Sequence, residues 1–171
     1  EKAGVEILDF VLEPLASAYS VLDTNERDLG VVLIDIGGGT TDVIVYRDGG
    51  VMHAGAIPIG GTNITNDIAY GLQTTREQAE LIKCKHGSAR TALADPEENI
   101  TIAGTGGRES KTVSQNTLAS IIEPRMDEIF RLAKNEINKS NYLGENTFGI
   151  VLTGGGSQLR HVEDLAQDIF K

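Results

Sequence analysis

Short apolar runs alternate along the chain with segments whose apolar residues recur at helical spacing. GVVLIDI, at residues 30–36, is a continuous β-branched run, which predicts a strand buried on both faces. TDVIVYRDGGVMHAGAIPIGG, at residues 41–61, predicts two strands that form a hairpin around Asp48-Gly49-Gly50. TFGIVLT, at residues 147–153, predicts a further strand. VEILDFVLEP, at residues 5–14, is apolar and ends at a proline, which favours an extended strand.

Five segments have the pattern expected of helices. They are LASAYSVL (15–22), ITNDIAYGL (64–72), REQAELIKCKHG (76–87), TLASIIEPRMDEIFRLAKNEINKS (117–140) and HVEDLAQDIF (161–170). Thr75 and Ser114 are expected to cap the third and fourth of these, and Pro124 is expected to kink or break the fourth. NITIAG and ESKTVS predict two short strands around a turn at residues 104–107. TNERDLG, at residues 24–30, predicts a polar loop.

The order of these elements predicts an α/β fold with two subdomains. Strands that end in glycine turns lie near both ends, and they enclose a block of helices and two short strands, as an insertion would. We therefore expect residues 14–61 and 147–171 to form a lower subdomain and residues 62–146 to form an inserted α+β upper subdomain.

The composition narrows the classes of partner. The formal net charge of the 171 residues is −10, so the chain as a whole is expected to repel nucleic acid. Cys84 is the single cysteine, which fits a reducing compartment. The chain begins at Glu1 and stops at Lys171, and both ends look cut, so we expect it to be part of a longer protein.

Two glycine loops share one pattern. IDIGGGTTD and VLTGGGSQL each leave a β-branched strand, pass through three glycines and reach a hydroxyl residue. Consecutive glycines let a backbone approach a phosphate or a base, and their N–H groups can form an anion-binding concavity. The alternative is that both loops are tight turns without a ligand. Two such loops after buried strands in one short chain favour ligand binding.

Asp35 lies at the end of the first of these strands. Its carboxylate is expected to be partly desolvated, which is costly unless the charge is compensated. A hydrated Mg²⁺, which binds a few carboxylates together with water and phosphate oxygens, would compensate it. The alternative is a carboxylate that accepts hydrogen bonds from the N–H groups of its own turn. Asp42 is expected to be structural and to hold the loop.

The motifs resemble those of the actin-like ATPase superfamily, which has a ribonuclease H-like fold. IDIGGGTTD is similar to the second phosphate motif of that superfamily, and VLTGGGSQL is similar to its adenosine motif. Within it, VLEPLASAYSVL, IPIGGTNITNDIAYGL, AELIKCKHGSA and TLASIIEPRMDEI resemble the FtsA family of bacterial cell-division proteins, over essentially the whole chain. The resemblance implies that residues 1–13 are the last strand of a first domain and that the rest is a second domain.

The resemblance also implies roles for single residues in binding ATP and Mg²⁺. Asp35 would coordinate Mg²⁺ through water and help to position the attacking water, and Glu13 would be a second carboxylate near the metal. The residues implied for the phosphates are Gly37, Gly38, Gly39 and Thr40, and those for the adenosine are Gly154, Gly155, Gly156 and Ser157. At most a slow ATPase is implied for the intact protein, and the isolated chain is expected to be inactive.

Glu80 and Lys83 correspond to a pair in the family that contacts the ribose and the adenine. Their i, i+3 spacing puts both side chains on one face of a helix. Spacing alone favours an ordinary surface ion pair worth less than about 1 kcal/mol. The resemblance shifts the interpretation toward a contact with the ligand.

Arg125 and Glu128 are also separated by three residues, and the pattern by itself indicates a solvated helix face. The resemblance implies that both contact the C-terminal peptide of FtsZ, for which an arginine fork is suited because it binds carboxylates bidentately. It further implies self-association into filaments, and attachment to the cytoplasmic face of the inner membrane at the division site through a C-terminal helix that this chain lacks.

Alternative functions remain open from the residues alone. Another actin-like ATPase, such as a rod-shape filament protein, a chaperone ATPase or a sugar kinase, would carry similar glycine loops. A nucleotide-free interaction module, in which the loops only shape the fold, is the remaining alternative.

Overall fold

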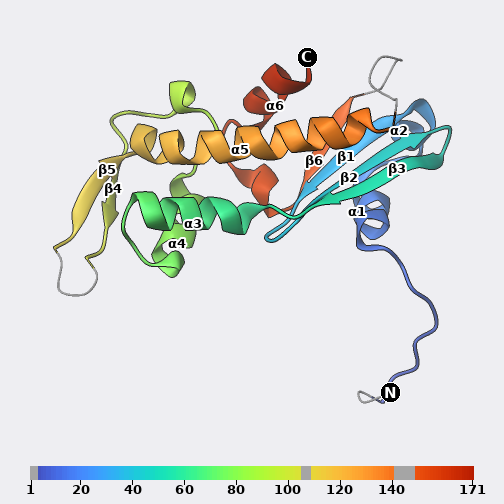
Figure 1. Cartoon of the computed structure of the whole chain (residues 1–171), viewed down its shortest axis with the longest axis horizontal. Coiled ribbons are helices and arrows are strands. Elements are labelled where there is room, and N and C mark those ends of the chain that lie inside the picture. The colour runs from blue at the N-terminus through green and yellow to red at the C-terminus, as the bar shows by residue number, and fades with distance from the viewer. Residues whose placement is uncertain (1–3, 105–108, 141–148) are drawn as a thin grey trace.

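The centre of the protein is a four-stranded mixed sheet. The computed structural model describes residues 4–104, 109–140 and 149–171. The strands lie in the order β3-β2-β1-β6, with β1 antiparallel to β2 and parallel to β6 (Figure 1). Their bounds are β1 Val31–Ile36, β2 Thr41–Arg47, β3 Gly50–Ile57 and β6 Ile150–Thr153. All four predicted strands of the sheet are confirmed within these bounds. Thr147 and Phe148 of the predicted last strand lie outside the described residues.

Strand β1 is buried on both faces, as its continuous apolar run predicts. Val32 and Ile34 pack into the larger core cluster on one face, whereas Val31 and Leu33 pack into a smaller cluster on the other. Helix α1 (Glu13–Val21) contacts the second face and contributes the buried Ala18. The alternation of side chains along the strand therefore supplies two cores from one segment.

Four longer helices extend one core beyond the sheet. They are α3 (Gly61–Gly71), α4 (Arg76–His86) and α6 (Val162–Phe170), together with the 24-residue α5 (Gln115–Asn138). Helix α5 contacts β2 near one of its ends and the short strand β5 (Lys111–Ser114) near the other, and it also packs against α3 (Figure 1). Strand β5 pairs with β4 (Asn99–Ile102). The larger core cluster runs without interruption from the sheet to α3, α4 and α5. The predicted subdomain bounds at 61/62 and 146/147 stay a prediction.

The prediction of a polar loop at residues 24–30 was wrong. These residues form the short helix α2 (Thr24–Leu29). Asp23 accepts a hydrogen bond from the backbone N–H of Glu26, and the Glu26 carboxylate accepts one from the N–H of Asp23. This capping box stabilises a helix whose polar composition hides it from hydrophobic periodicity.

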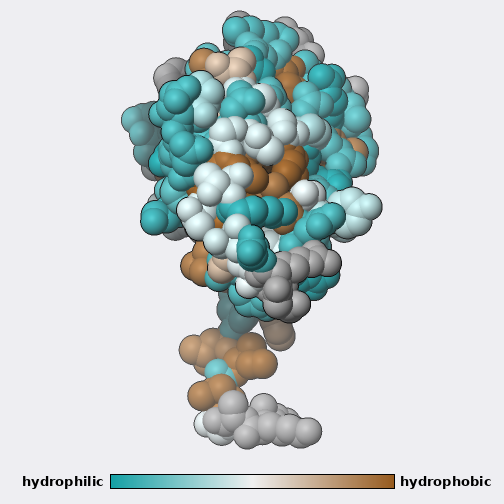
Figure 2. Space-filling model, turned by 90° about the vertical axis from the view of Figure 1, so that its left-hand side faces the viewer, coloured by the Kyte–Doolittle hydropathy of each residue, from teal (hydrophilic) through white to brown (hydrophobic). Residues whose placement is uncertain are grey.

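Residues 5–12 form no strand within the chain. They precede α1 as an extended segment that lies away from the rest of the protein, and the apolar side chains of this segment are exposed (Figures 1 and 2). A strand needs the hydrogen-bond ladder of a partner, and none of the described residues pairs with this segment. Its assignment to a preceding domain stays a prediction.

Pro124 does not interrupt α5. Thr75 and Ser114 cap α4 and α5 as predicted, and α5 then continues through the proline as one helix. Pro124 and Ser120 are both exposed, so the carbonyl group that loses its i+4 N–H donor faces solvent. Residues 105–107 of the turn predicted between β4 and β5 lie outside the described residues. No described helix has the length and apolar character needed to cross a membrane.

Phe130 lies at the junction of α5 and α6, where its ring packs edge-on against that of Phe170 with 5.8 Å between the ring centroids. We expect Phe130→Ala to lower the free energy of unfolding by about 3–5 kcal/mol, since it empties a fully buried site. The matched control is Phe10→Ala on the exposed segment, which should change it by less than about 0.5 kcal/mol. Urea denaturation followed by circular dichroism measures both. A similar loss of unfolding free energy in both variants would contradict the placement of Phe130 in the core.

Candidate nucleotide site

The two glycine loops lie side by side at one edge of the sheet. Strands β1 and β6 are parallel neighbours, and Asp35 lies opposite Thr153 in their register. Both loops therefore leave the sheet at the carboxyl ends of adjacent strands. They also touch, because a Cβ on Gly154 would come within 2.6 Å of the carbonyl oxygen of Ile36.

Four of the six glycines in these loops fall into two kinds. Gly154 has a φ of +82°, and a Cβ at Gly156 would collide with the Ile36 side chain, so close packing requires glycine at both positions. Gly39 and Gly155 differ: a Cβ on either would have no atom within 4 Å. The fold does not need glycine there, which leaves the space beside the backbone free for a ligand.

The first loop is bonded to the beginning of α3. The N–H of Gly61 donates to the carbonyl of Gly37 at 2.9 Å, and the N–H of Thr62 donates to the carbonyl of Gly38 at 2.8 Å. Gly60 packs so closely that a Cβ would lie 2.6 Å from the Gly37 oxygen. Helix α3 therefore begins directly against the loop predicted to bind phosphate. The sequence pattern predicts the helix but not this contact.

Glu80 and Lys83 join the same assembly. The Lys83 ammonium group donates to the carbonyl of Gly61 at 3.0 Å, to the Thr65 hydroxyl at 3.0 Å and to Glu80 at 2.8 Å. Only 12% of the Lys83 side chain is exposed, so this is not an ordinary surface pair. The predicted pair on α4 is thereby held to the start of α3 and, through Gly61, to the first glycine loop.

Thr65 was missed by the sequence analysis. Its hydroxyl is buried between the Gly61 carbonyl and the Glu80 carboxylate, and it also accepts a hydrogen bond from Lys83. The available signal was a threonine on the apolar face of α3. Burial raises the pKa of the Glu80 carboxyl, but the hydrogen bonds from Lys83 and Thr65 outweigh it, and the net result is a lowered pKa.

Asp35 and Asp42 face one another across the β1–β2 pair. Burial raises the pKa of the Asp42 carboxyl, a hydrogen bond from the Thr40 hydroxyl opposes this, and the nearby Asp35 charge raises it further. Two adjacent carboxylates beside an open loop suit a hydrated divalent cation, which would relieve their repulsion. No cluster of three or more metal-binding side chains occurs in the described part of the chain. These donors thus fit Mg²⁺ bound largely through water and phosphate, and the predicted roles of Asp35 stay a prediction.

Three predicted site residues lie apart from the loops. Glu13 is exposed at the first turn of α1, and its side chain forms no hydrogen bond or ion pair with the described residues. Arg125 binds both carboxylate oxygens of Asp67 on α3, at 2.7 and 3.1 Å, and also pairs with Glu128. The Arg125 guanidinium group is therefore already bound by a carboxylate from another helix of this chain, which the helical spacing alone could not indicate.

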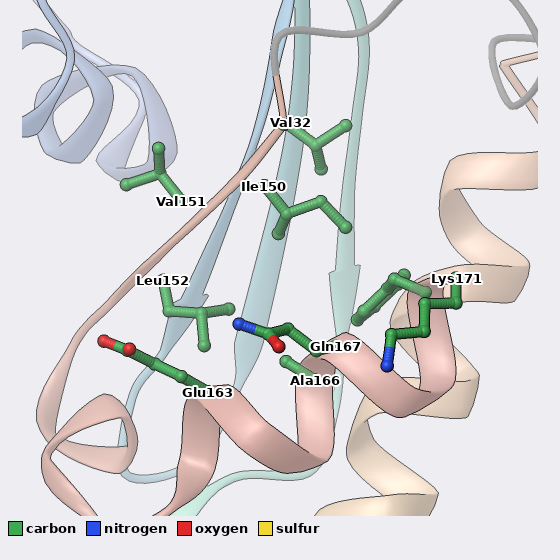
Figure 3. A pocket seen from close by; sticks show the side chains of 10 residues that line it. Val32, Ile150, Val151, Leu152, Glu163, Ala166, Gln167 and Lys171 are labelled. Carbon is green, nitrogen blue, oxygen red and sulfur yellow. The ribbon is translucent and has the colours of Figure 1, made fainter.

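A groove of about 720 Å³ lies elsewhere, between β6 and α6 (Figure 3). Its walls are mainly apolar, with Ile150 and Leu152 on the strand and Ala166 and Phe170 on the helix. None of the residues predicted to contact the nucleotide lines it. The groove follows the outer edge of β6, beside which no further strand lies among the described residues, so it resembles an unpaired sheet edge and not a phosphate site.

Comparison with known proteins gives consistent matches. A family model described as "Cell division protein FtsA" matches residues 32–171. The cell division protein FtsA of Pseudomonas aeruginosa is 44% identical over 169 residues, covering 99% of this chain and 40% of that protein. That of Bacillus subtilis is 40% identical over 171 residues, covering 100% of this chain and 39% of that protein. The chain thus spans about 40% of the length of these curated relatives.

Solved structures agree on the fold. MreB5 of Spiroplasma citri bound to ADP superimposes with a TM-score of 0.86 at 23% identity, over 99% of this chain and 55% of that one. The PilM–PilN type IV pilus biogenesis complex gives a TM-score of 0.72 at 19% identity, over 98% of this chain and 42% of that one. The predicted α/β, actin-like fold is confirmed.

The lowered pKa of Glu80 makes a prediction about stability and pH. Because its folded-state pKa lies below the unfolded value, the ionised carboxylate stabilises the fold above the unfolded pKa, and this contribution is lost as the pH falls through the folded value. We expect Glu80→Gln to be less stable than the wild type at pH 7 and to converge with it between roughly pH 5 and pH 3. Urea denaturation across this range is the measurement, with the exposed Glu163→Gln as the control. A pH-independent difference would show that the Glu80 carboxylate has no stabilising partner.

Proposed function

Because the chain belongs to the FtsA family of cell-division proteins, we propose that it forms the adenine-nucleotide-binding second domain of a polymerising division scaffold. In this proposal the first loop contacts the phosphates through Gly37, Gly38, Gly39 and Thr40. The second loop faces the adenosine through Gly154, Gly155, Gly156 and Ser157, and Glu80 and Lys83 contact the ribose and the base. The observation that carries the proposal is the open space at Gly39 and Gly155, which the packing of the fold does not explain.

Magnesium belongs to the same proposal. Asp35 would bind the ion through water, and Asp42 would lie next to Asp35. In the intact protein, Glu13 would supply a second carboxylate near the ion. The ion would neutralise phosphate charge. The chain spans about 40% of its relatives, so the remaining wall of the cleft is expected from the rest of the parent protein. We therefore expect weak binding and almost no hydrolysis by this chain alone.

Binding can be tested on the ¹⁵N-labelled chain by titration with Mg·ATP. We expect the amide resonances of Gly37–Gly39 and Gly154–Gly156 to shift. Gly155→Leu should reduce the affinity at least tenfold because its side chain fills the free space, yet it should leave stability within about 0.5 kcal/mol of the wild type. Gly154→Ala is the matched structural variant and should destabilise the fold through its positive φ. Shifts confined to other regions would overturn the nucleotide site.

The partner proposed for the intact protein is the C-terminal peptide of FtsZ, bound near Arg125 and Glu128. Support comes from the family and from the position of Arg125, whose side chain is partly exposed and already binds one carboxylate in bidentate fashion. A peptide carboxylate would share or replace Asp67 in this pair. Attachment of the parent to the cytoplasmic face of the inner membrane, and its assembly into filaments at the division site, complete the proposal.

The internal Asp67 pair allows a sharp test of the peptide site. Asp67→Asn removes the carboxylate that binds the Arg125 fork, leaves the pair with Glu128, and should leave binding of a synthetic FtsZ tail peptide unchanged or tighter. Arg125→Glu should weaken it by about fivefold or more, the cost of losing a charge-assisted pair. The swapped variant Arg125→Asp with Asp67→Arg keeps an internal pair and serves as the stability control. Equal peptide affinity in fluorescence anisotropy for all of these would dismiss the site.

A further inference from the structure

The segment that follows the second glycine loop is held by the C-terminal end of α4. The N–H of Ala89 donates to the carbonyl of Arg160 at 2.8 Å, and the N–H of Arg160 donates to the carbonyl of Gly87 at 3.2 Å. Ser88 and Arg160 thus form an isolated parallel bridge. A Cβ on Gly87 would lie 2.6 Å from the Leu159 side chain, so the two segments are in direct contact.

One carboxylate reinforces this bridge from outside. Glu98, just before β4, binds the Arg160 guanidinium at 2.9 Å with one oxygen and the His86 ring at 2.5 Å with the other. Its side chain is 26% exposed, so these contacts are shielded in part from water. We call Glu98, His86 and Arg160 the clasp.

The base of the clasp is rigid. Gln115, which is buried, donates to the carbonyl of His86 at 3.1 Å and accepts from the N–H of Asp95 at 2.7 Å. Its own N–H donates to the carbonyl of Glu98 at 2.9 Å. The end of α4, the start of β4 and the start of α5 are therefore locked together, and only the Arg160 side of the clasp reaches toward the second loop.

We propose that Glu98 is a positioning residue that sets the distance between the second glycine loop and α4 by holding Arg160 against His86. The inference rests on the proposed nucleotide site, because these two elements carry the groups assigned to the adenosine. Arg160 comes three residues after Ser157, and His86 comes three residues after Lys83 on α4. The clasp thus ties together the two walls of the slot for the base and ribose. The first loop, which is held separately by Gly61, is not part of it.

This separation gives the test its discrimination. Mg·ATP uses both loops, whereas Mg·tripolyphosphate carries no base and uses the first loop alone. We expect Glu98→Gln to weaken Mg·ATP binding by about fivefold, in the range of one partly shielded ion-pair network, and to leave tripolyphosphate binding unchanged. Arg160→Gln should behave in the same way, and Arg160→Lys should restore part of the ATP affinity. The matched control is Glu97→Gln, whose side chain makes no hydrogen bond with the described residues.

A second readout needs no nucleotide. In amide hydrogen exchange of the unliganded chain, Glu98→Gln should speed exchange at residues 155–160 severalfold relative to Glu97→Gln, while residues 61–65 stay as in the wild type. Unchanged exchange at 155–160, or an equal loss of ATP and tripolyphosphate affinity, would overturn the positioning role. If the wild type binds neither compound while its exchange responds to Glu98→Gln, the nucleotide proposal fails and the clasp is purely structural.

Discussion

The parallel pairing of β1 with β6 is the constraint on which the candidate site depends. Two segments more than a hundred residues apart in the chain leave the sheet at the same edge because their strands run in the same direction side by side. Without this pairing the two loops would not touch each other, and the contacts of Gly154 and Gly156 with Ile36 would not form. The close contact with Ile36 then determines which glycines serve the fold and which leave open space.

The helices outside the sheet are attached to this edge by polar contacts as well as by the core. The Gly61 carbonyl accepts a hydrogen bond from the Lys83 ammonium group and the Gly61 N–H donates to the Gly37 carbonyl, so a single residue connects α4 to the first loop. The Arg160–Glu98–His86 contacts attach the same last turn of α4 to the segment that follows the second loop. Helix α4 is thereby held at two points. A change in its position is expected to reach both loops.

The charged groups show why residue spacing is a weak guide to chemistry. Arg125 lies three positions before a glutamate, and Lys83 lies three positions after one. Their spacing along the helix therefore predicts the same kind of ion pair for both. In the fold, Lys83 is largely buried against a backbone carbonyl, whereas Arg125 shares its fork with Asp67 of a neighbouring helix. The difference comes from the elements packed against each pair, which lie 18 to 58 residues away in the chain.

Much of this protein could be read from the order of its residues. Continuous β-branched runs give strands buried on both sides, caps at Thr75 and Ser114 start helices, and glycine runs after strands mark tight loops, because these features depend on neighbours in the chain. The capping box at Asp23 was also local, but polar composition hid it. The role of Thr65, the engagement of Arg125 and the lack of a strand at residues 5–12 depend on which distant groups lie opposite, and hydrogen bonds between them have no period in the sequence. Only tertiary structure decided those, since it alone brings donor and acceptor within 3 Å.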